Sequence, residues 1–133
     1  MQEDHSPPVI FLEKALDRLE EALAKPADAI VRDACIQRFE FTFEMAWKAI
    51  RSYARAEGLE CASPRDCFRT GFRLRLIENH PQWMAMVEDR NRTTHTYDED
   101  SAEAIYGALP AYARLVRELL EKLKEGESGW RAR

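Results

Sequence analysis

The chain has 133 residues, of which 45% are hydrophobic, 33% charged and 10% aromatic. This length predicts a single domain over residues 1–133, with a core at about 9–125 and a frayed tail at 126–133. Five Gly and six Pro are too few for a low-complexity chain or a turn-rich β-sandwich. The net charge of −4 argues against a protein that coats nucleic acid indiscriminately.

No apolar run approaches the roughly 20 residues of a membrane helix, and the polar start of the sequence is unlike a secretory signal. We therefore expect a cytoplasmic protein with no membrane segment.

Cysteine usage is also typical of a cytoplasmic protein. Cys35, Cys61 and Cys67 are odd in number and lack the close pairing of metal-binding cysteines. We therefore expect three reduced thiols and no metal site. The sequence also has no Gly-rich phosphate-binding loop, so we expect no cofactor.

In chain order, the first predicted helix begins after Ser6 and ends before Pro26. Its apolar residues recur at steps of four and three positions, which is the spacing of one helix face: Leu12, Leu16, Leu19 and Leu23. A second, long helix is predicted from a cap at Asp28 to about Glu57, with Gly58 as its left-handed stop. Its apolar residues are too widely spread for one narrow stripe, so we expect neighbours on more than one side: Ile30, Phe39, Phe41, Phe43, Ala46, Trp47, Ile50 and Tyr53.

The second half of the sequence predicts three further helices. One begins at the cap Ser63 and runs to around Glu78, with inward-facing residues at Phe68, Phe72 and Leu76. After a break at 79–81, a short helix carries Trp83, Met84 and Val87. The last helix is expected over about 98–125, with a kink or a restart at Pro110. Short connections between antiparallel amphipathic helices predict an all-α fold, an up-and-down bundle of four to five helices.

A row of arginines lies on the third predicted helix. Arg65, Arg69 and Arg73 recur every four residues and therefore share one face, which we expect to be exposed. The guanidinium group is a planar, bidentate phosphate donor, so this row is a candidate RNA-binding surface. The alternative is a solvated face whose arginines reflect the base composition of the genome.

The polar segment 88–97 concentrates residues that no apolar stripe requires. Thr96 and Glu99 have the spacing of a capping box, which predicts that His95 lies just before the first turn of the last helix. The N–H groups and dipole of such a helix end favour a neutral imidazole and attract a phosphate. His95 is then a candidate general base, and Arg90 a candidate for the positive charge that phosphoryl chemistry needs. The alternative is a polar loop in which His95 and Arg90 only cap carbonyl groups.

Three separated motifs in the chain resemble a known family. Arg90, His95 and Tyr97 have the spacing of the R-x4-H-x-Y motif of HEPN-domain proteins, in the toxin branch often called HepT. The stretches 39–48 and 63–66, together with Arg90-Asn91 and 95–97, are similar to nucleotidyltransferase substrate-binding proteins, which are small helical proteins encoded beside a minimal nucleotidyltransferase. The resemblance covers about residues 9–125.

The resemblance to HEPN toxins implies a metal-independent endoribonuclease. It acts as a homodimer on RNA, with the arginine and histidine of both copies facing a shared cleft. By this resemblance His95 acts on the ribose 2′-hydroxyl and Arg90 holds the scissile phosphate, while Asn91 orients the phosphate or His95. An exposed Tyr97 is the residue to which the partner nucleotidyltransferase transfers AMP, which blocks the cleft.

The resemblance to substrate-binding proteins implies a different activity. The chain is then a non-catalytic subunit whose partner supplies the nucleotide chemistry. Acidic residues of the bundle receive a cationic acceptor, and the candidates are Glu40, Glu44, Glu88 and Asp89. The presence of Tyr97, which pure binding does not need, favours the toxin. A member kept only as a scaffold is the third alternative.

Overall fold

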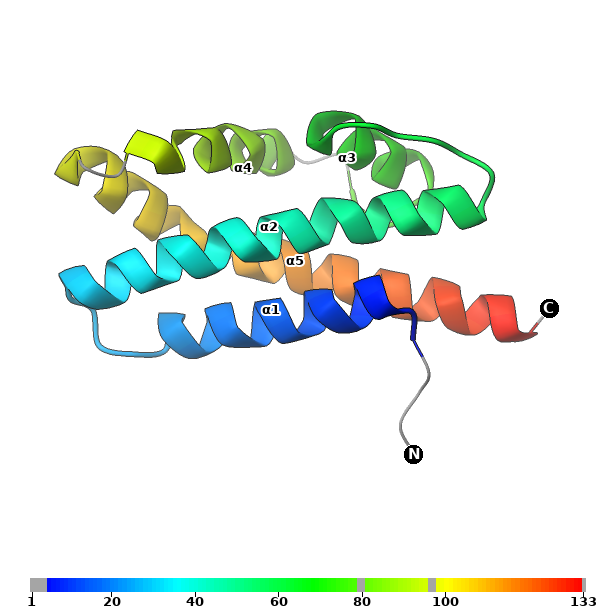
Figure 1. Ribbon diagram of the computed structural model, residues 1–133, viewed down its shortest axis with the longest axis horizontal. Coiled ribbons are helices and arrows are strands. Elements are labelled where there is room, and N and C mark those ends of the chain that lie inside the picture. Colours follow the sequence, from blue (N-terminus) through cyan, green and yellow to red (C-terminus); the bar gives the residue numbers. More distant parts are fainter. Residues whose placement is uncertain (1–4, 79–80, 96–97, 133) are drawn as a thin grey trace.

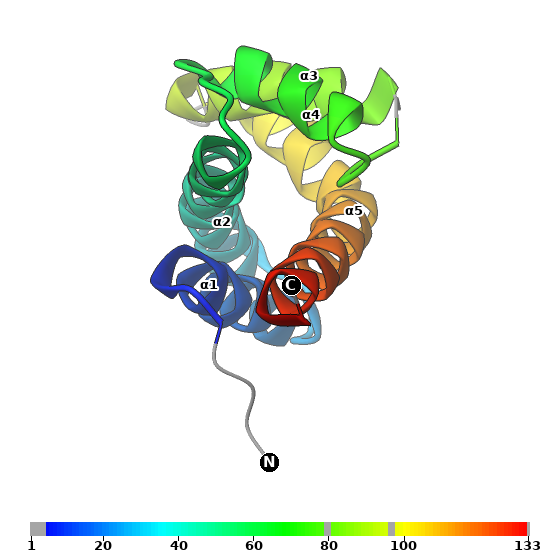
Figure 2. The same ribbon diagram turned by 90° about the vertical axis from the view of Figure 1, so that its right-hand side faces the viewer.

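A computed structural model describes residues 5–78, 81–95 and 98–132. These residues form helices and no strand: α1 (Pro7–Leu23), α2 (Ala29–Ala56), α3 (Pro64–Arg73), α4 (Pro81–Arg92), the 3-10 turn η1 (Thr93–His95) and α5 (Glu99–Ala132). The long helices α1, α2 and α5 run alongside one another, and α3 and α4 follow each other along the side opposite α1 (Figure 1, Figure 2). The predicted all-α bundle is confirmed. None of the described helices is long and apolar enough to cross a membrane.

The core lies where the apolar faces of α1, α2 and α5 meet, and α2 is central, as its broad apolar surface predicts. Phe43 of α2 makes an edge contact with Phe68 of α3 at 5.6 Å between ring centroids. Phe68 in turn contacts Trp83 of α4 at 4.9 Å, so a chain of rings joins three helices. Two residues assigned to the inner surface of α2 are exposed instead. Ile30 is 81% exposed in the first turn, and Phe41 is 59% exposed on the side of α2 that faces α1.

The ends of α2 and α3 use the same backbone motif, although the sequence suggests it only for α2. Gly58, with φ of +83°, closes α2, and Leu59 N–H donates to Ala54 C=O at 2.9 Å. Arg75, with φ of +62°, closes α3, and its neighbour Leu76 donates to Gly71 C=O at 2.9 Å.

The extension of α3 to Glu78 is therefore wrong. An arginine in the left-handed region is uncommon, so residue type alone did not indicate the stop. Phe72, expected to face inward, is 47% exposed, so this expectation is also wrong.

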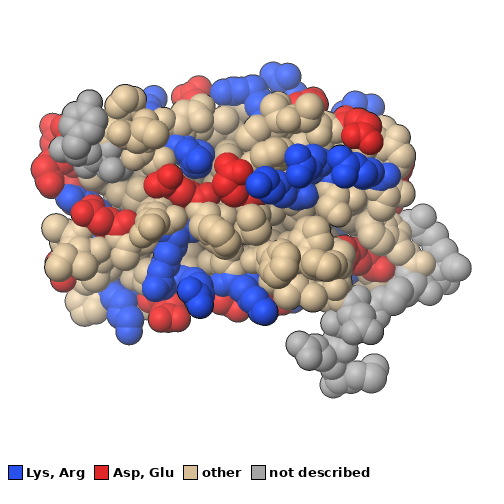
Figure 3. Space-filling view, viewed as in Figure 1, with Lys and Arg blue, Asp and Glu red and all other residues tan. Residues whose placement is uncertain are grey.

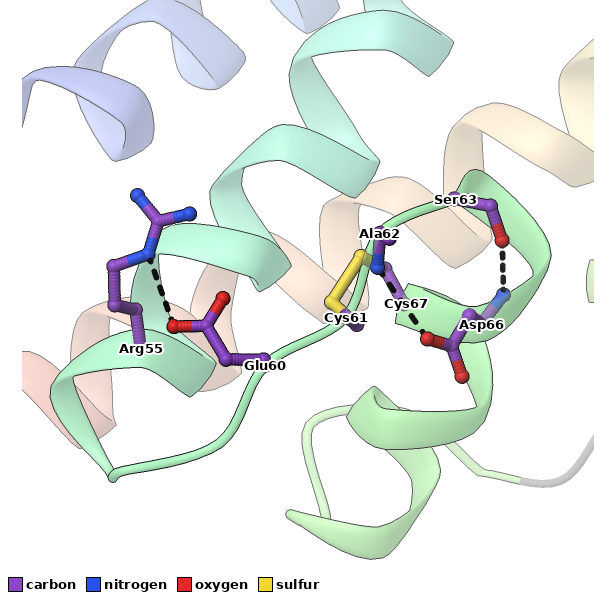
Figure 4. The surroundings of a disulfide bond; sticks show 7 residues. All are labelled: Arg55, Glu60, Cys61, Ala62, Ser63, Asp66 and Cys67. Atoms are coloured by element: carbon purple, nitrogen blue, oxygen red, sulfur yellow. Dashed lines mark hydrogen bonds and ion pairs between the residues drawn. A yellow bond between two sulfur atoms is a disulfide. The ribbon is translucent and has the colours of Figure 1, made fainter.

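The entry to α3 is held by a cap and a disulfide (Figure 4). Ser63 accepts from the N–H of Asp66 at 3.2 Å, which confirms the predicted cap. Cys61 and Cys67 form a disulfide with their Cα atoms 5.1 Å apart. The expectation of three reduced thiols is therefore wrong for this pair, while Cys35 is a buried free thiol. The two paired cysteines flank the cap, two residues before Ser63 and four after it, where the entering chain folds back over the first turn.

The C-terminal segment is helical rather than frayed. Helix α5 continues through Pro110 without a restart and reaches Ala132. Trp130 stacks on Tyr53 of α2 at 4.7 Å, and its indole N–H donates to Glu57 at 2.9 Å. The carboxylate of Glu127, which is 7% exposed, accepts from the N–H of Ser6 at 3.0 Å. These contacts tie residues 127–130 to α2 and to the start of α1, so the prediction of a frayed tail is wrong for this part of the chain.

Candidate functional site

The C-terminal end of α4 and the turn η1 position three of the sequence-predicted residues: Arg90, Asn91 and His95. Two threonine hydroxyls shape this end. Thr93 Oγ1 donates to the carbonyl of Arg90 at 2.7 Å, and Thr94 Oγ1 to that of Asn91 at 3.4 Å. They satisfy carbonyls that the helix leaves without N–H donors, and the chain tightens into η1. Asn91 and His95 are exposed there, while Thr93 is buried.

Arg90 points from α4 toward α2 and is loosely held. Its Nη2 lies 3.7 Å from Oε1 of Glu44, and its side chain is 26% exposed. The same carboxylate accepts from the indole N–H of Trp47 at 3.2 Å and lies 3.7 Å from the ammonium group of Lys48. Within the described part of the chain, the buried Nε of Arg90 has no hydrogen-bond partner. Because its one ion pair is long and its side chain is partly exposed, the guanidinium keeps much of its capacity to bind an anion through its terminal nitrogens.

Asp89 fixes the turn that carries Arg90. Its Oδ2 accepts from the hydroxyl of Tyr112 on α5 at 2.5 Å, and its Oδ1 from Arg92 at 3.2 Å. The ring of Tyr112 is buried and stacks on Phe39 of α2 at 5.7 Å. Burial, and then the hydrogen bond to the Asp89 carboxylate, raise the pKa of Tyr112. The sequence places Tyr112 on a helix face with no role in the site, and only the packing of α4 on α5 reveals its partner.

The start of α5 is strongly acidic. Asp98 precedes the helix, and its carbonyl accepts from the N–H of Ala102 at 3.0 Å. Glu99 and Asp100 occupy the first turn. Arg32 of α2 is buried and donates to Glu99 at 2.7 Å, and this hydrogen bond lowers the pKa of Glu99. Carboxylates therefore already complement the positive end of the helix dipole, which weakens the expected attraction of that end for a phosphate.

Two predicted residues, the cap Thr96 and the modification site Tyr97, lie outside the described residues. The helix that follows them begins at Glu99, immediately after Asp98. His95 is connected to this start, because its carbonyl accepts from the N–H of Asp98 at 3.1 Å.

The arginine row of α3 is a separate feature, and only part of it is exposed. Arg69 and Arg73 are exposed, whereas Arg65 is half-buried, with Nη1 3.5 Å from Sδ of Met84 on α4. The expected exposed face therefore comprises two of the three arginines. Among the described residues, no group of three or more His, Cys, Asp or Glu side chains is arranged to hold a metal ion.

The fold and the sequence both match known proteins. The sequence model of a family described as nucleotidyltransferase substrate binding protein like matches residues 10–125. The chain belongs to this family. It is 28% identical over 131 residues to a Haemophilus influenzae protein named "Probable ribonuclease HepT", a match that covers 86% of this chain and 90% of that protein.

Two solved structures of the same shape extend the comparison. A protein from Thermus thermophilus is 44% identical, with a TM-score of 0.80, over 84% of this chain and 98% of its own. A Haemophilus influenzae protein is 25% identical, with a TM-score of 0.79, over 87% of this chain and 98% of its own. The second structure is described as revealing the fold of a substrate binding domain of a nucleotidyltransferase. The family description thus links this bundle to a nucleotidyltransferase.

Proposed function

We propose that this chain is a HEPN-type toxin, a metal-independent endoribonuclease that a partner nucleotidyltransferase neutralises by transferring AMP to Tyr97. The observation that carries the proposal is the partly exposed guanidinium of Arg90, held by one long ion pair within the described part of the chain, five positions before the exposed His95. The relative named as a ribonuclease supports the same activity. In this proposal two copies form a homodimer, with the segment 90–97 of each at the interface.

The proposed reaction is an internal attack within the RNA strand. His95, as a neutral imidazole, takes the proton of a ribose 2′-hydroxyl. The 2′-oxygen then forms a bond to the adjacent phosphorus, the bond from phosphorus to the 5′-oxygen breaks, and the 5′-oxygen takes a proton from water. The products are a 2′,3′-cyclic phosphate and a 5′-hydroxyl. Arg90 and Asn91 bind the phosphate oxygens, whose negative charge is stabilised by the guanidinium.

The proposed neutralisation is a nucleotidyl transfer. The phenol of Tyr97 gives its proton to water, its oxygen forms a bond to the α-phosphorus of ATP on the partner enzyme, the bond from that phosphorus to the β-phosphate oxygen breaks, and pyrophosphate leaves. The adduct carries a negative charge two positions from His95. It excludes RNA by its bulk and its charge, because the phosphodiester takes the place of an RNA phosphate beside Arg90.

The substitution His95→Ala tests the nuclease activity directly. We expect the variant to lose cleavage of an RNA substrate in EDTA while keeping the helicity and melting temperature of the wild type, because His95 is exposed. Gln82→Ala, at an exposed position of α4 away from His95, is the matched control and keeps full activity. Light scattering on the same samples measures the homodimer. An inactive wild-type dimer, or a monomer at tens of micromolar, contradicts the proposal.

Intact-mass analysis tests the modification. Co-expression with an active nucleotidyltransferase partner is expected to add one or more AMP groups to the wild type and none to Tyr97→Phe. The Tyr97→Phe variant stays toxic in the presence of that partner. An unchanged mass of the wild type beside an active partner overturns this part of the proposal.

One observation favours the second candidate, a non-catalytic substrate-binding subunit. Three carboxylates belong to this region: Glu44 of α2 pairs with Arg90, and Glu88 and Asp89, the two residues before Arg90 on α4, pair with Arg92. Such a cluster suits a cationic acceptor better than an RNA backbone. An inactive wild type that binds an aminoglycoside in calorimetry, with loss of binding in Glu88→Gln, supports this function instead.

A further inference from the structure

A furrow between α1 and α2 has an apolar floor that is open to solvent. It includes a hollow of about 650 Å³ with Phe11, Phe41 and Met45 in its lining. A second hollow of about 340 Å³ shares Phe11 and Met45 with the first and continues the furrow along α2. Phe11 is 53% and Phe41 is 59% exposed. A contiguous row of exposed aromatic rings on a helix pair is a common mark of a binding surface.

The charged residues that line the two hollows are all basic, and two of them pair with acids beside the furrow, Lys48 with Glu44 and Arg55 with Glu60. The residues that line the two hollows include six cations and no acid: Lys14, Arg18, Arg38, Lys48, Arg51 and Arg55. Figure 3 shows basic side chains on either side of an uncharged surface over α1 and α2. This is notable in a chain whose net charge is −4.

Three cations of the furrow lack acidic partners among the described residues, because three of the four acids of α1 pair with α5 instead. Asp17 and Glu20 pair with Arg117 of α5, and Glu13 pairs with Lys124 of α5 at 2.7 Å. Within the described part of the chain, neither Lys14 nor Arg18 has a carboxylate within ion-pair distance. Arg38 likewise has no carboxylate partner there and donates to the main-chain carbonyl of Arg18 at 2.7 Å. Three of the four acids of α1 thus pair with α5, while its cations lie on the furrow; the fourth acid, Glu21, is exposed.

We propose that the furrow is the docking surface for an amphipathic helix of a partner protein, with an apolar face and acidic flanks. Apolar residues of that helix cover Phe11 and Phe41, and its carboxylates pair with the cations on both rims, as in other helix-in-groove complexes. The lining residues of α2 run from 37 to 55, a distance of about 27 Å, which accommodates a helix of about 18 residues. This surface is independent of the ribonuclease activity proposed above. The nucleotidyltransferase to which the family description points is the first protein to examine for such a helix.

Two other occupants fit the charges less well. A second copy of this chain would bring the same cations against the furrow. An RNA strand in the furrow would have to pass Glu44, which pairs with Lys48 of the furrow and with Arg90 of α4, and Glu40 one turn before it, in order to reach the candidate site. The carboxylates of this ridge repel a phosphate backbone.

A designed peptide tests the proposal on the full chain. The probe is a helical peptide of about 18 residues with leucines three and four positions apart and glutamates on both flanks. Fluorescence anisotropy is expected to show saturable binding that weakens as salt is added. Phe41→Ser, and separately the pair Lys14→Glu with Arg18→Glu, are expected to weaken binding by about tenfold or more. Phe72→Ser and Arg69→Glu, which are exposed outside the furrow, are the matched controls and leave binding unchanged.

A charge-swapped probe and an RNA probe complete the experiment. A peptide with lysines in place of the glutamates is expected to bind the Lys14→Glu, Arg18→Glu protein more tightly than the wild type. Melting temperatures establish that each variant is folded. The proposal is overturned if the acidic peptide does not bind, if the control variants lose binding to the same extent, or if single-stranded polyuridine binds through Phe41 and Lys14 in place of the peptide.

Discussion

At the scale of single residues, one carboxylate organises the surroundings of the candidate site. Asp89 accepts from Tyr112 of α5 and from Arg92 of its own helix, and the next residue along the chain is Arg90. Hydrogen bonds to a charged group stabilise a fold more than neutral ones. Asp89 therefore holds the last turn of α4 against α5, while Arg90 reaches α2 through Glu44. Arg90 makes one long ion pair, whereas Asp89 beside it is fixed by two hydrogen bonds.

Removal of the Tyr112 hydroxyl gives a pH-dependent change in stability. At pH 7, Tyr112→Phe is expected to lower the free energy of unfolding by about 1.5–3 kcal/mol, because it removes a hydrogen bond to the partly buried carboxylate of Asp89. The pKa of Tyr112 is raised in the folded protein. Above pH 10 the unfolded tyrosine therefore loses its proton first, and the contribution of Tyr112 to stability falls as the pH rises.

Urea unfolding measures this effect. The difference in stability between the wild type and Tyr112→Phe is expected to shrink between about pH 9.5 and 11. Tyr106, whose pKa is also raised, is present in both proteins and cancels from the comparison. A difference that stays constant over this range contradicts the argument.

At the scale of helices, the positions where elements stop decide which residues reach the surface. Gly58 and Arg75 close α2 and α3 with the same pair of backbone hydrogen bonds. Only Gly adopts the required left-handed conformation without steric cost. The stop at Arg75 leaves Phe72 and Arg73 at the end of a ten-residue helix instead of in the middle of a longer one.

Glycine at position 75 is expected to stabilise the protein. Arg75→Gly relieves the strain of a positive φ and should raise the free energy of unfolding by about 0.5–1 kcal/mol. Arg73→Gly, two residues earlier in helical conformation, is the matched control and should lower it by about 0.5–1 kcal/mol. Thermal and urea unfolding distinguish the two. Equal destabilisation by both substitutions would show that the side-chain contacts of Arg75 stabilise the fold by more than its positive φ destabilises it.

Two glycines of α5, one near each end of the helix, give a second matched pair. Gly107 has open space around its Cα, so Gly107→Ala should stabilise the helix by about 1 kcal/mol. At Gly126 a Cβ would overlap the ring and hydroxyl of Tyr53, which stacks on Trp130. Gly126→Ala should therefore destabilise the protein by about 1–3 kcal/mol. Calorimetry gives the two melting temperatures, and stabilisation at both sites would mean that residues 126–130 do not stay packed on α2 in solution.

At the scale of the whole molecule, a chain of negative net charge presents separate basic surfaces. The furrow between α1 and α2 carries one group of cations, and the exposed end of α3 carries Arg69 and Arg73. Acidic residues gather around Arg90 and at the start of α5. An approaching polyanion is therefore attracted to particular faces rather than to the molecule as a whole.

If the end of α3 contacts RNA, its arginines control the salt dependence of binding. Arg69→Ala and Arg73→Ala should each lower the slope of log affinity against log salt by about 0.7–0.9. Arg65→Ala should leave the slope unchanged, because that guanidinium is half-buried against Met84. Anisotropy with the non-cleaving His95→Ala protein measures the slopes. Three unchanged slopes would mean that the row is only a solvated face.

The sequence by itself determined the helices, because helix starts and apolar spacing are local properties. The caps at Asp28 and Ser63 and the stop at Gly58 stand where residue types place them. It also singled out Arg90, Asn91 and His95, since polar residues without a core role are visible in a single chain. The folded structure decided which residues pair: the Tyr112–Asp89 hydrogen bond and the packing of Trp130 on Tyr53 across helices, and the disulfide of Cys61 with Cys67 at the start of α3. The packing of the helices also left Phe41 exposed, because a side chain is buried only where a neighbouring element covers it. Helical periodicity does not specify which neighbour that is.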